Sequence, residues 1–128
     1  MVDLSYMSGV ILIIVISAFA LLGAVGLFAP GHIARYFGNK SVNRDQLSEL
    51  RAVYGGLPLS IAAIGAVTLC NISPLTIQQA LFFISMLLLG MAAGRLFALC
   101  MQRPTKRSHV FLVLELLFGG VALYGFFT

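Results

Sequence analysis

Residues Met7–Ala29, MSGVILIIVISAFALLGAVGLFA, form an apolar segment of 23 residues without a charged side chain, and this segment indicates a membrane fold. A helix rises about 1.5 Å per residue, so this stretch reaches about 34 Å and crosses the ~30 Å hydrocarbon core of a bilayer. Pro30 and Gly31 follow it and end the helix. A cleaved signal peptide is not favoured, because no Lys or Arg precedes the run and the run is too long. We therefore expect a first transmembrane span.

Composition places the whole chain in a membrane. Of its 128 residues, 60% are hydrophobic and 9% are charged, whereas a soluble domain carries about 25% charged residues. Unfolded chains are poor in apolar residues, so disorder is excluded as well. The length allows one domain, and we expect residues 1–128 to form a single transmembrane domain.

Three further apolar runs complete the predicted fold. They cover residues 53–70, 80–101 and 110–127, and the loops between them are only about nine and about eight residues long. Short loops make consecutive helices antiparallel neighbours. Pro58 lies early in the second span, where it removes a backbone hydrogen bond and is expected to kink the helix. The predicted fold is an all-α, integral-membrane, antiparallel four-helix bundle.

The loop between the first two spans carries two local signals. Apolar and polar residues recur there at helical spacing, which predicts a short amphipathic segment on the inner membrane surface. The residues concerned are His32, Ile33, Arg35, Tyr36 and Phe37. Asn43 with Gln46 three residues later resembles a capping box, so the second helix is expected to begin in water and run into the membrane.

The basic residues set the predicted orientation. All eight lie in the first and third loops or on the flanks of those loops: Arg35, Lys40, Arg44, Arg51, Arg95, Arg103, Lys106 and Arg107. Because cytoplasmic loops are the basic ones, we expect loops one and three in the cytoplasm and both termini outside, in the periplasm of a bacterium. The positive charge lies beside the membrane, where anionic lipid attracts it. The sequence has no basic stripe with interleaved aromatic residues outside the predicted spans, so it does not indicate a nucleic-acid partner.

Cysteines and histidines predict neither a metal site nor a cofactor. Cys70 lies at the outer end of the second span and Cys100 at the inner end of the third. A disulfide needs Cα atoms within about 7 Å, so these two cannot bridge within one chain. His32 and His109 are lone loop histidines without companions at ligand spacing.

Two charged residues lie inside predicted spans. Counted from the loop that joins the third and fourth spans, Arg95 and Glu115 both lie about 9–11 Å below the same interface. An unpaired charge near the bilayer centre costs at least about 2.5–3.5 kcal/mol, so we expect a salt bridge between these spans. One interpretation is structural: the pair pins the two helices together, and Gly90 and Gly94, one turn apart, let their backbones approach closely.

The other interpretation is a binding site. Arg51 enters the second span from the cytoplasmic side, and Tyr54 follows three residues later on the same helical face. Gly55–Gly56 leaves room beside that face for a neighbouring helix or a ligand. If this helix packs on the third or fourth span, Arg51 and Tyr54 converge on Arg95 and Glu115. Two cations and one carboxylate then leave a surplus positive charge, suited to an anionic lipid or amphiphile. Alternatively, Arg51 snorkels to the interface.

The same residues carry a resemblance to a known family. The segments LRAVYGG (50–56), AGR (93–95) and LEL (114–116) resemble the domain of unknown function DUF4345, a family of small bacterial four-span membrane proteins. The similarity covers residues 10–127, and Pro58 departs from the expected pattern. It implies a four-span fold and a bacterial inner-membrane location, and it implies no reaction. The residues that match the family pattern are Arg51, Tyr54, Gly55, Gly56, Gly94, Arg95 and Glu115.

Three classes of function stay open. The favoured one is a multi-pass inner-membrane protein that binds an anionic membrane lipid or amphiphile at Arg51, Tyr54, Arg95 and Glu115. The second is a structural or accessory subunit of a larger membrane complex, or a homo-oligomer, held through phenylalanine-rich faces. A small exporter ranks third, because the loop charges are one-sided and an Arg at the same depth holds the Glu ionised. An enzyme is less favoured again, since no nucleophile triad, metal cluster, phosphate loop or carboxylate pair occurs.

Overall fold

The computed structural model describes residues 4–39, 41–101 and 106–128, and these residues form helices joined by turns, with no strand among them. The helices are α1 (Leu4–Phe28), α2 (Pro30–Tyr36), α3 (Arg44–Leu50), the π-helical turn η1 (Arg51–Gly56), α4 (Leu57–Leu69), α5 (Ile77–Met101) and α6 (Lys106–Phe127). Four stretches are long and apolar enough to cross a membrane: Tyr6–Phe28, Arg44–Leu69, Ile77–Met101 and His109–Phe127. The predictions of an all-helical chain and of four helices of membrane-spanning length are confirmed.

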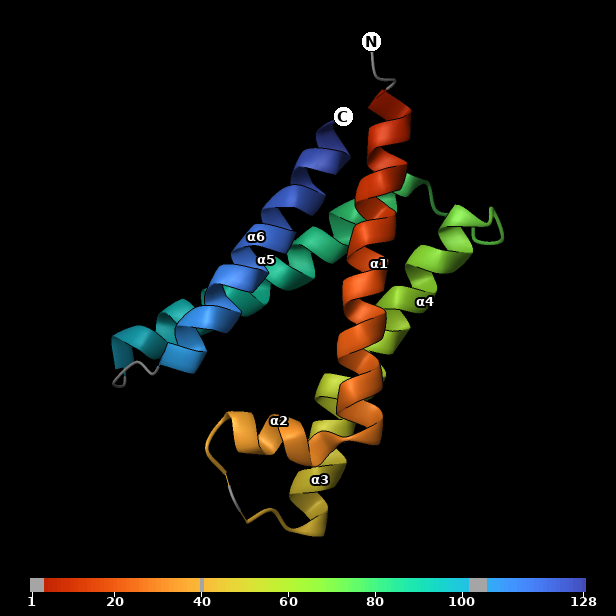
Figure 1. Cartoon of the computed structure of the whole chain (residues 1–128). Coiled ribbons are helices and arrows are strands. Elements are labelled where there is room, and N and C mark those ends of the chain that lie inside the picture. The colour runs from red at the N-terminus through yellow and green to blue at the C-terminus, as the bar shows by residue number, and fades with distance from the viewer. Residues whose placement is uncertain (1–3, 40, 102–105) are drawn as a thin grey trace.

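The long helices are arranged as two pairs (Figure 1). α1 packs along η1 and α4, and α5 packs along α6 over most of its length. The two pairs meet near the end of the molecule that carries both termini and diverge towards the end that carries α2, α3 and the start of α6. The buried core lies in the half near the termini, where Leu12, Val15, Ile61, Leu81 and Ile84 meet. The buried core that joins the two pairs therefore lies in that half.

Hydrogen bonds join the ends of α1 and α6 beside this core. The Ser8 hydroxyl, fully buried, donates to the carbonyl of Gly125 at 3.0 Å. The hydroxyls of Ser8 and Thr128 lie 3.1 Å apart. Because a buried hydroxyl without a partner is costly, these bonds stabilise the position of the first helix beside the last.

Capping boxes begin the second and third long helices. The Asn43 side chain accepts from the Gln46 N–H at 2.8 Å, and the Gln46 side chain accepts from the Asn43 N–H at 3.0 Å. This confirms the predicted capping box. Thr76 and Gln79 make the same pair of bonds, at 3.1 and 3.0 Å, which the sequence analysis missed. These polar first turns precede the apolar runs. The two helices therefore begin at residues 44 and 77, ahead of the predicted span starts at 53 and 80.

The π-helical turn η1 accommodates Pro58. Pro58 has no N–H to bond the carbonyl of Tyr54, and the helix widens so that the Leu57 N–H donates to the Ala52 carbonyl, five residues earlier. Wide turns of this kind occur as single insertions in α-helices. The interruption expected at Pro58 therefore takes the form of a π turn. It places the Tyr54 carbonyl against α1, where a Cβ on Gly26 would overlap it.

Glycines on both sides allow α1 and η1 to touch through their backbones. A Cβ on Gly55 would lie 2.7 Å from the backbone nitrogen of Leu27, so no larger residue fits without movement. Gly56, its neighbour, faces no such contact, because a Cβ there would meet only the Arg51 carbonyl at 3.8 Å. Of the two glycines predicted to make room beside the second span, Gly55 is therefore the one at a helix contact.

The contact between α5 and α6 uses a different glycine from those predicted. A Cβ on Gly90 or Gly94 would meet nothing within 4 Å, so the expected close approach at these residues is not found. Gly119 of α6 lies at the contact instead, where a Cβ would be 3.1 Å from a side-chain carbon of Leu89. Small residues four apart recur often in a chain with 13 glycines, and their spacing does not say which face of α5 meets α6.

The outward faces of the long helices are apolar. In each of the four membrane-length helices, only 28–33% of the residues in an apolar 18-residue segment are buried within the chain. Large side chains such as Leu21, Phe28 and Phe97 are exposed. A surface of this kind is stable against lipid tails or against another membrane protein, and not against water.

Gly26→Ala tests the backbone contact between α1 and η1. The added methyl group must displace the Tyr54 carbonyl, and overpacking of this kind costs about 1–3 kcal/mol. Gly90→Ala is the matched control, because its methyl group enters open space. Thermal unfolding in detergent, followed by circular dichroism, should show a lower midpoint for Gly26→Ala alone. Equal midpoints for the two variants would contradict the contact.

Candidate functional site

The charged centre of the molecule is the pair predicted from depth in the membrane. Arg95 of α5 donates from Nε to Oε1 of Glu115 in α6 across 2.7 Å. Glu115 is 4% exposed, and the Arg95 side chain is 19% exposed. The predicted salt bridge between the third and fourth spans is confirmed, and the carboxylate is its more deeply buried member.

Each charged group of the pair keeps unused hydrogen-bonding capacity. Oε2 of Glu115 is buried and has no hydrogen-bond partner among the described residues. Within the same part of the chain, the hydrogen bond of Arg95 uses Nε, and its two Nη groups make none. Leaving a buried polar group unpaired costs about 1–3 kcal/mol, and more for a charged one. The pair is therefore neutral as a whole but incompletely satisfied.

One aromatic ring lies against the Arg95 guanidinium, and further rings pack on that ring. Its Cζ lies 5.0 Å from the centre of the Phe111 ring, within the range of a cation–π interaction. Phe111 stacks on Phe37 with ring centres 5.2 Å apart and meets the edge of Tyr36 at 5.5 Å. Phe37 also contacts Tyr54, at 5.9 Å. This aromatic cluster ties α2, η1 and α6 together around one cation.

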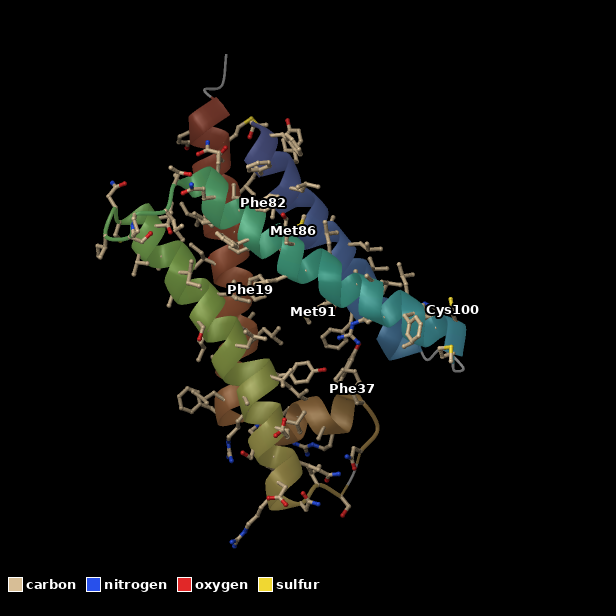
Figure 2. The ribbon with its side chains drawn as sticks, turned by 180° about the vertical axis from the view of Figure 1, so that it is seen from behind. Phe19, Phe37, Phe82, Met86, Met91 and Cys100 are labelled. Carbon is tan, nitrogen blue, oxygen red and sulfur yellow. The ribbon has the colours of Figure 1, made fainter. Side chains whose placement is uncertain are left out.

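A cavity of about 190 Å³ lies between the two helical pairs. Its walls are mostly apolar and come from all four long helices, with Phe19, Met91 and Phe118 among them. Figure 2 shows Phe19, Met91 and Phe37 in the region between the α1–α4 pair and the α5–α6 pair. The polar side chains on its walls are Tyr54, Arg95 and Glu115. The cavity therefore has an apolar body and one polar wall.

The mouth of this cavity is apolar as well. Val53, Leu57, Met91 and Leu114 line it and are 42–47% exposed. In a bilayer, exposed apolar side chains on membrane-spanning helices face lipid tails. In a bilayer, a mouth with these side chains would face lipid tails.

Arg51 lies apart from the other three candidate residues. Its Nε donates to the Leu27 carbonyl at the end of α1, at 3.2 Å, and the side chain is exposed and does not line the cavity. The reason is the π turn: a π-helix has more residues per turn than an α-helix, so residues three apart are separated by a larger angle about the helix axis. Arg51 and Tyr54 therefore do not share a face, contrary to the expectation from their spacing. The structure brings together Tyr54, Arg95 and Glu115.

Several aromatic residues of the site were not recognised as such from the sequence. Phe111 and Phe118 are half-buried and line the cavity. They lie four residues before and three residues after Glu115, which places all three on one helical face. Met91 lies four residues before Arg95 in the same way. Counting three or four residues along the helix from Glu115 and from Arg95 would have identified these residues from the sequence.

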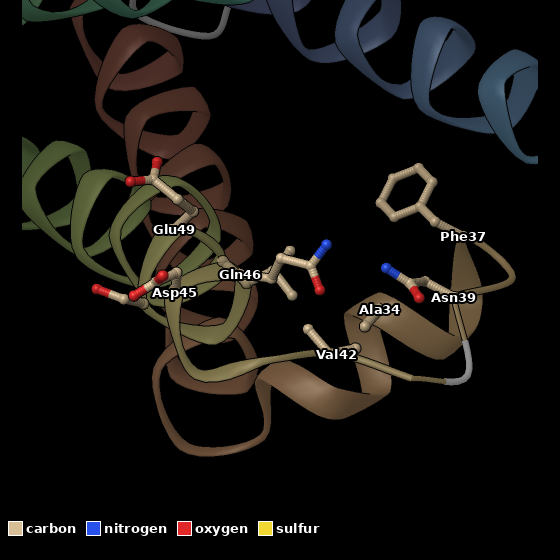
Figure 3. A pocket seen from close by; sticks show the side chains of 9 residues that line it. Ala34, Phe37, Asn39, Val42, Asp45, Gln46 and Glu49 are labelled. Carbon is tan, nitrogen blue, oxygen red and sulfur yellow. The ribbon is translucent and has the colours of Figure 1, made fainter.

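A second, wider hollow lies between α2 and α3 and holds neither member of the ion pair. Its volume is about 560 Å³, and Figure 3 shows the amides of Asn39 and Gln46 directed into it. Asp45 and Glu49 also line it. Among the described residues, no three His, Cys, Asp or Glu side chains are placed to hold a metal ion. Cys70 and Cys100 are both free and exposed.

Comparison with known proteins gives a family and no activity. The family model DUF4345, described as a domain of unknown function, matches residues 7–126. No curated protein and no solved structure matches the chain. The match includes every residue that lines the cavity, and the chemistry of the site must be inferred from its geometry.

Arg95→Ala tests how much the fold depends on the ion pair. It leaves the Glu115 carboxylate without a cation in an apolar environment, and breaking a buried pair in this way costs about 3–5 kcal/mol. Arg51→Ala should cost far less, because Arg51 is exposed. Thermal unfolding of the purified variants in detergent measures the difference.

The double variant separates pairing from packing. Replacing both Arg95 and Glu115 by Ala removes the stranded charge, so we expect it to recover most of the stability lost in Arg95→Ala. A double variant no more stable than Arg95→Ala would show that the pair does not act through charge compensation.

Proposed function

We propose that this chain, which belongs to the DUF4345 family, is a lipid-binding membrane protein. It binds the polar end of a lipid or lipid-like amphiphile between its two helical pairs. The observation that carries this proposal is the buried Arg95–Glu115 pair on the wall of an otherwise apolar cavity. An amphiphile has the same division, with a polar head and an apolar chain. Its head would lie at the pair and its chain along the apolar walls.

The size and position of the cavity support a membrane-dissolved ligand. Its volume of about 190 Å³ is smaller than the ~300–1,000 Å³ of pockets that enclose a whole drug-sized molecule. It would therefore hold the head-proximal part of a lipid and leave the rest of the chain outside. The apolar mouth at Leu57 and Met91 lets that chain continue among bilayer lipids.

The position of Arg51, outside the cavity, limits the charge that the head group can carry. An anionic amphiphile was expected because two cations, Arg51 and Arg95, were expected at the site. Arg51 lies at the end of α1 instead. Arg95 still offers two unused Nη groups to an acceptor such as a phosphate oxygen. Glu115 opposes a purely anionic head, because it carries a negative charge and lines the same cavity. The site therefore favours a head that carries an acceptor without excess negative charge.

We also propose that the four long helices form an antiparallel bundle in the inner membrane of a bacterium. α2, α3 and the start of α6 would face the cytoplasm, and both termini would lie outside. Arg35, Arg44 and Arg51 belong to this end of the molecule, as the positive-inside rule requires. Lys40 and Arg103 lie outside the described residues. α2 supports an interfacial position, because it buries Ile33 and leaves Arg35 exposed.

A second candidate function is that of a subunit in a larger membrane complex. Gly90 and Gly94 lie one turn apart on α5, and a Cβ on either would meet nothing within 4 Å. Small residues on an open face allow a helix of another chain, or of a second copy, to approach closely. The amphiphile site ranks first, because it includes a buried charge with an unpaired oxygen, which a helix contact at Gly90 does not explain.

Ala18→Leu tests occupancy of the cavity without touching the ion pair. Ala18 lines the cavity, and a leucine there fills part of its volume. Native mass spectrometry of protein extracted gently from its own membranes should show a retained lipid on the unaltered chain and loss of it from Ala18→Leu. Ala93→Leu is the control, since Ala93 is exposed and does not line the cavity. Extraction without any lipid, or with a protein partner only, would favour the subunit function.

The two native cysteines test the orientation. Both are exposed, Cys70 at the end of α4 and Cys100 at the end of α5. In intact cells, a membrane-impermeant maleimide should label a Cys100→Ala variant through Cys70 and should not label a Cys70→Ala variant. Permeabilised cells should show labelling of both variants. Labelling of Cys100 alone in intact cells would show that the chain is inserted the other way round.

A further inference from the structure

The unpaired oxygen of Glu115 restricts what kind of head group can bind. Oε1 accepts from Arg95, while Oε2 is buried and has no partner among the described residues, and Glu115 lines the cavity. An ionised carboxylate only accepts hydrogen bonds. The part of a ligand that reaches Oε2 must therefore be a donor. The Nη groups of Arg95 only donate, so the same head group must also carry an acceptor.

The charge of the site restricts the head group further. Arg95 and Glu115 contribute one positive and one negative charge, and the other described residues on the cavity walls carry none at neutral pH. A net negative ligand would leave an uncompensated charge in an apolar environment, which is unfavourable. A ligand with no net charge keeps the occupied site neutral.

A donor and an acceptor of opposite charge on one neutral head describe a zwitterion. We infer that the bound amphiphile is a phospholipid with a primary ammonium head, the phosphoethanolamine zwitterion; this inference rests on the proposed function. The ammonium group donates to Oε2 of Glu115, and the phosphate oxygens accept from the Nη groups of Arg95. The Tyr54 hydroxyl, on the same cavity, supplies a further donor to the phosphate. Charge-assisted hydrogen bonds of this kind are about twice as strong as neutral ones.

Other common head groups each lack one of these features. Choline has no N–H, so it leaves Oε2 of Glu115 without a donor. Glycerol phosphate offers hydroxyl donors but adds a net negative charge. Diacylglycerol is neutral and donates through its hydroxyl, but it forms no charge-assisted bond to Arg95 through a phosphate. The phosphoethanolamine head pairs with both charges, its phosphate with Arg95 and its ammonium group with Glu115.

The test is a competition among lipids with identical acyl chains. The purified full-length chain in detergent is equilibrated with equal amounts of phosphatidylethanolamine, phosphatidylcholine, phosphatidylglycerol and diacylglycerol, and the retained lipid is identified by native mass spectrometry. We expect phosphatidylethanolamine to exceed each of the others about tenfold, which corresponds to about 1.4 kcal/mol. Equal retention, or preference for another head, overturns the head-group inference. Retention of no lipid overturns the proposed function itself.

A methylation series checks the donor requirement without altering the protein. The mono- and dimethyl derivatives of phosphatidylethanolamine keep an N–H, and phosphatidylcholine does not. Retention should therefore persist through the dimethyl lipid and fall at the last methyl group. A steady decline that begins with the first methyl group would indicate a limit of size and would contradict a hydrogen bond to Glu115.

Glu115→Gln should reverse the preference. The amide oxygen of glutamine can still accept from Arg95, its NH₂ group replaces Oε2 by a donor, and the site gains a net positive charge. We expect this variant to prefer phosphatidylglycerol over phosphatidylethanolamine. Glu49→Gln is the matched control, because Glu49 is exposed and lines the other hollow. A folded Glu115→Gln variant that still prefers phosphatidylethanolamine would contradict the inference.

Discussion

A carboxylate inside a bilayer needs a cation within hydrogen-bond distance, and Glu115 of α6 meets this need through Arg95 of α5. The two residues are 20 apart in the chain, on helices that pack side by side, so their bond sets the register of one helix against the other. The same guanidinium lies over Phe111, and Phe111 stacks on Phe37 at the end of α2. The short helix between the first two spans is thereby held against the second helical pair.

The first helical pair is held by backbone contact instead of charge. Pro58 removes one hydrogen bond from the second long helix, and the π turn before it moves the Tyr54 carbonyl against Gly26 of α1. The proline that weakens one helix thus creates the surface on which its neighbour packs. Each pair is closely packed in itself, and the two pairs diverge away from the termini (Figure 1). The cavity lies between them, with Arg95 and Glu115 on its wall.

Parts of the site could be predicted because they depend on one helix at a time. Depth in the membrane follows from counting residues, so the pairing of Arg95 with Glu115 follows correctly from the sequence. The capping box at Asn43 is likewise local, since its bonds join residues three apart. Arg51 was grouped with the pair, but its Nε donates to the Leu27 carbonyl and it does not line the cavity. Its face depends on a π turn that the apolar pattern does not report. Gly90 and Gly94 were expected at a contact that Gly119 makes, because spacing does not identify the partner face.

Residue order alone predicts the membrane class, four helices of membrane-spanning length, the cap at Asn43 and the pairing of Arg95 with Glu115. These follow from the free energy of transferring residues into hydrocarbon and from hydrogen bonds within a few residues. Helix packing, in contrast, determines that the helices form two diverging pairs and that Arg51 lies away from the Arg95–Glu115 pair. It also determines that one oxygen of Glu115 is buried without a partner among the described residues. Those features depend on how helices cross and on where a turn widens, and contacts between side chains far apart in the chain determine both.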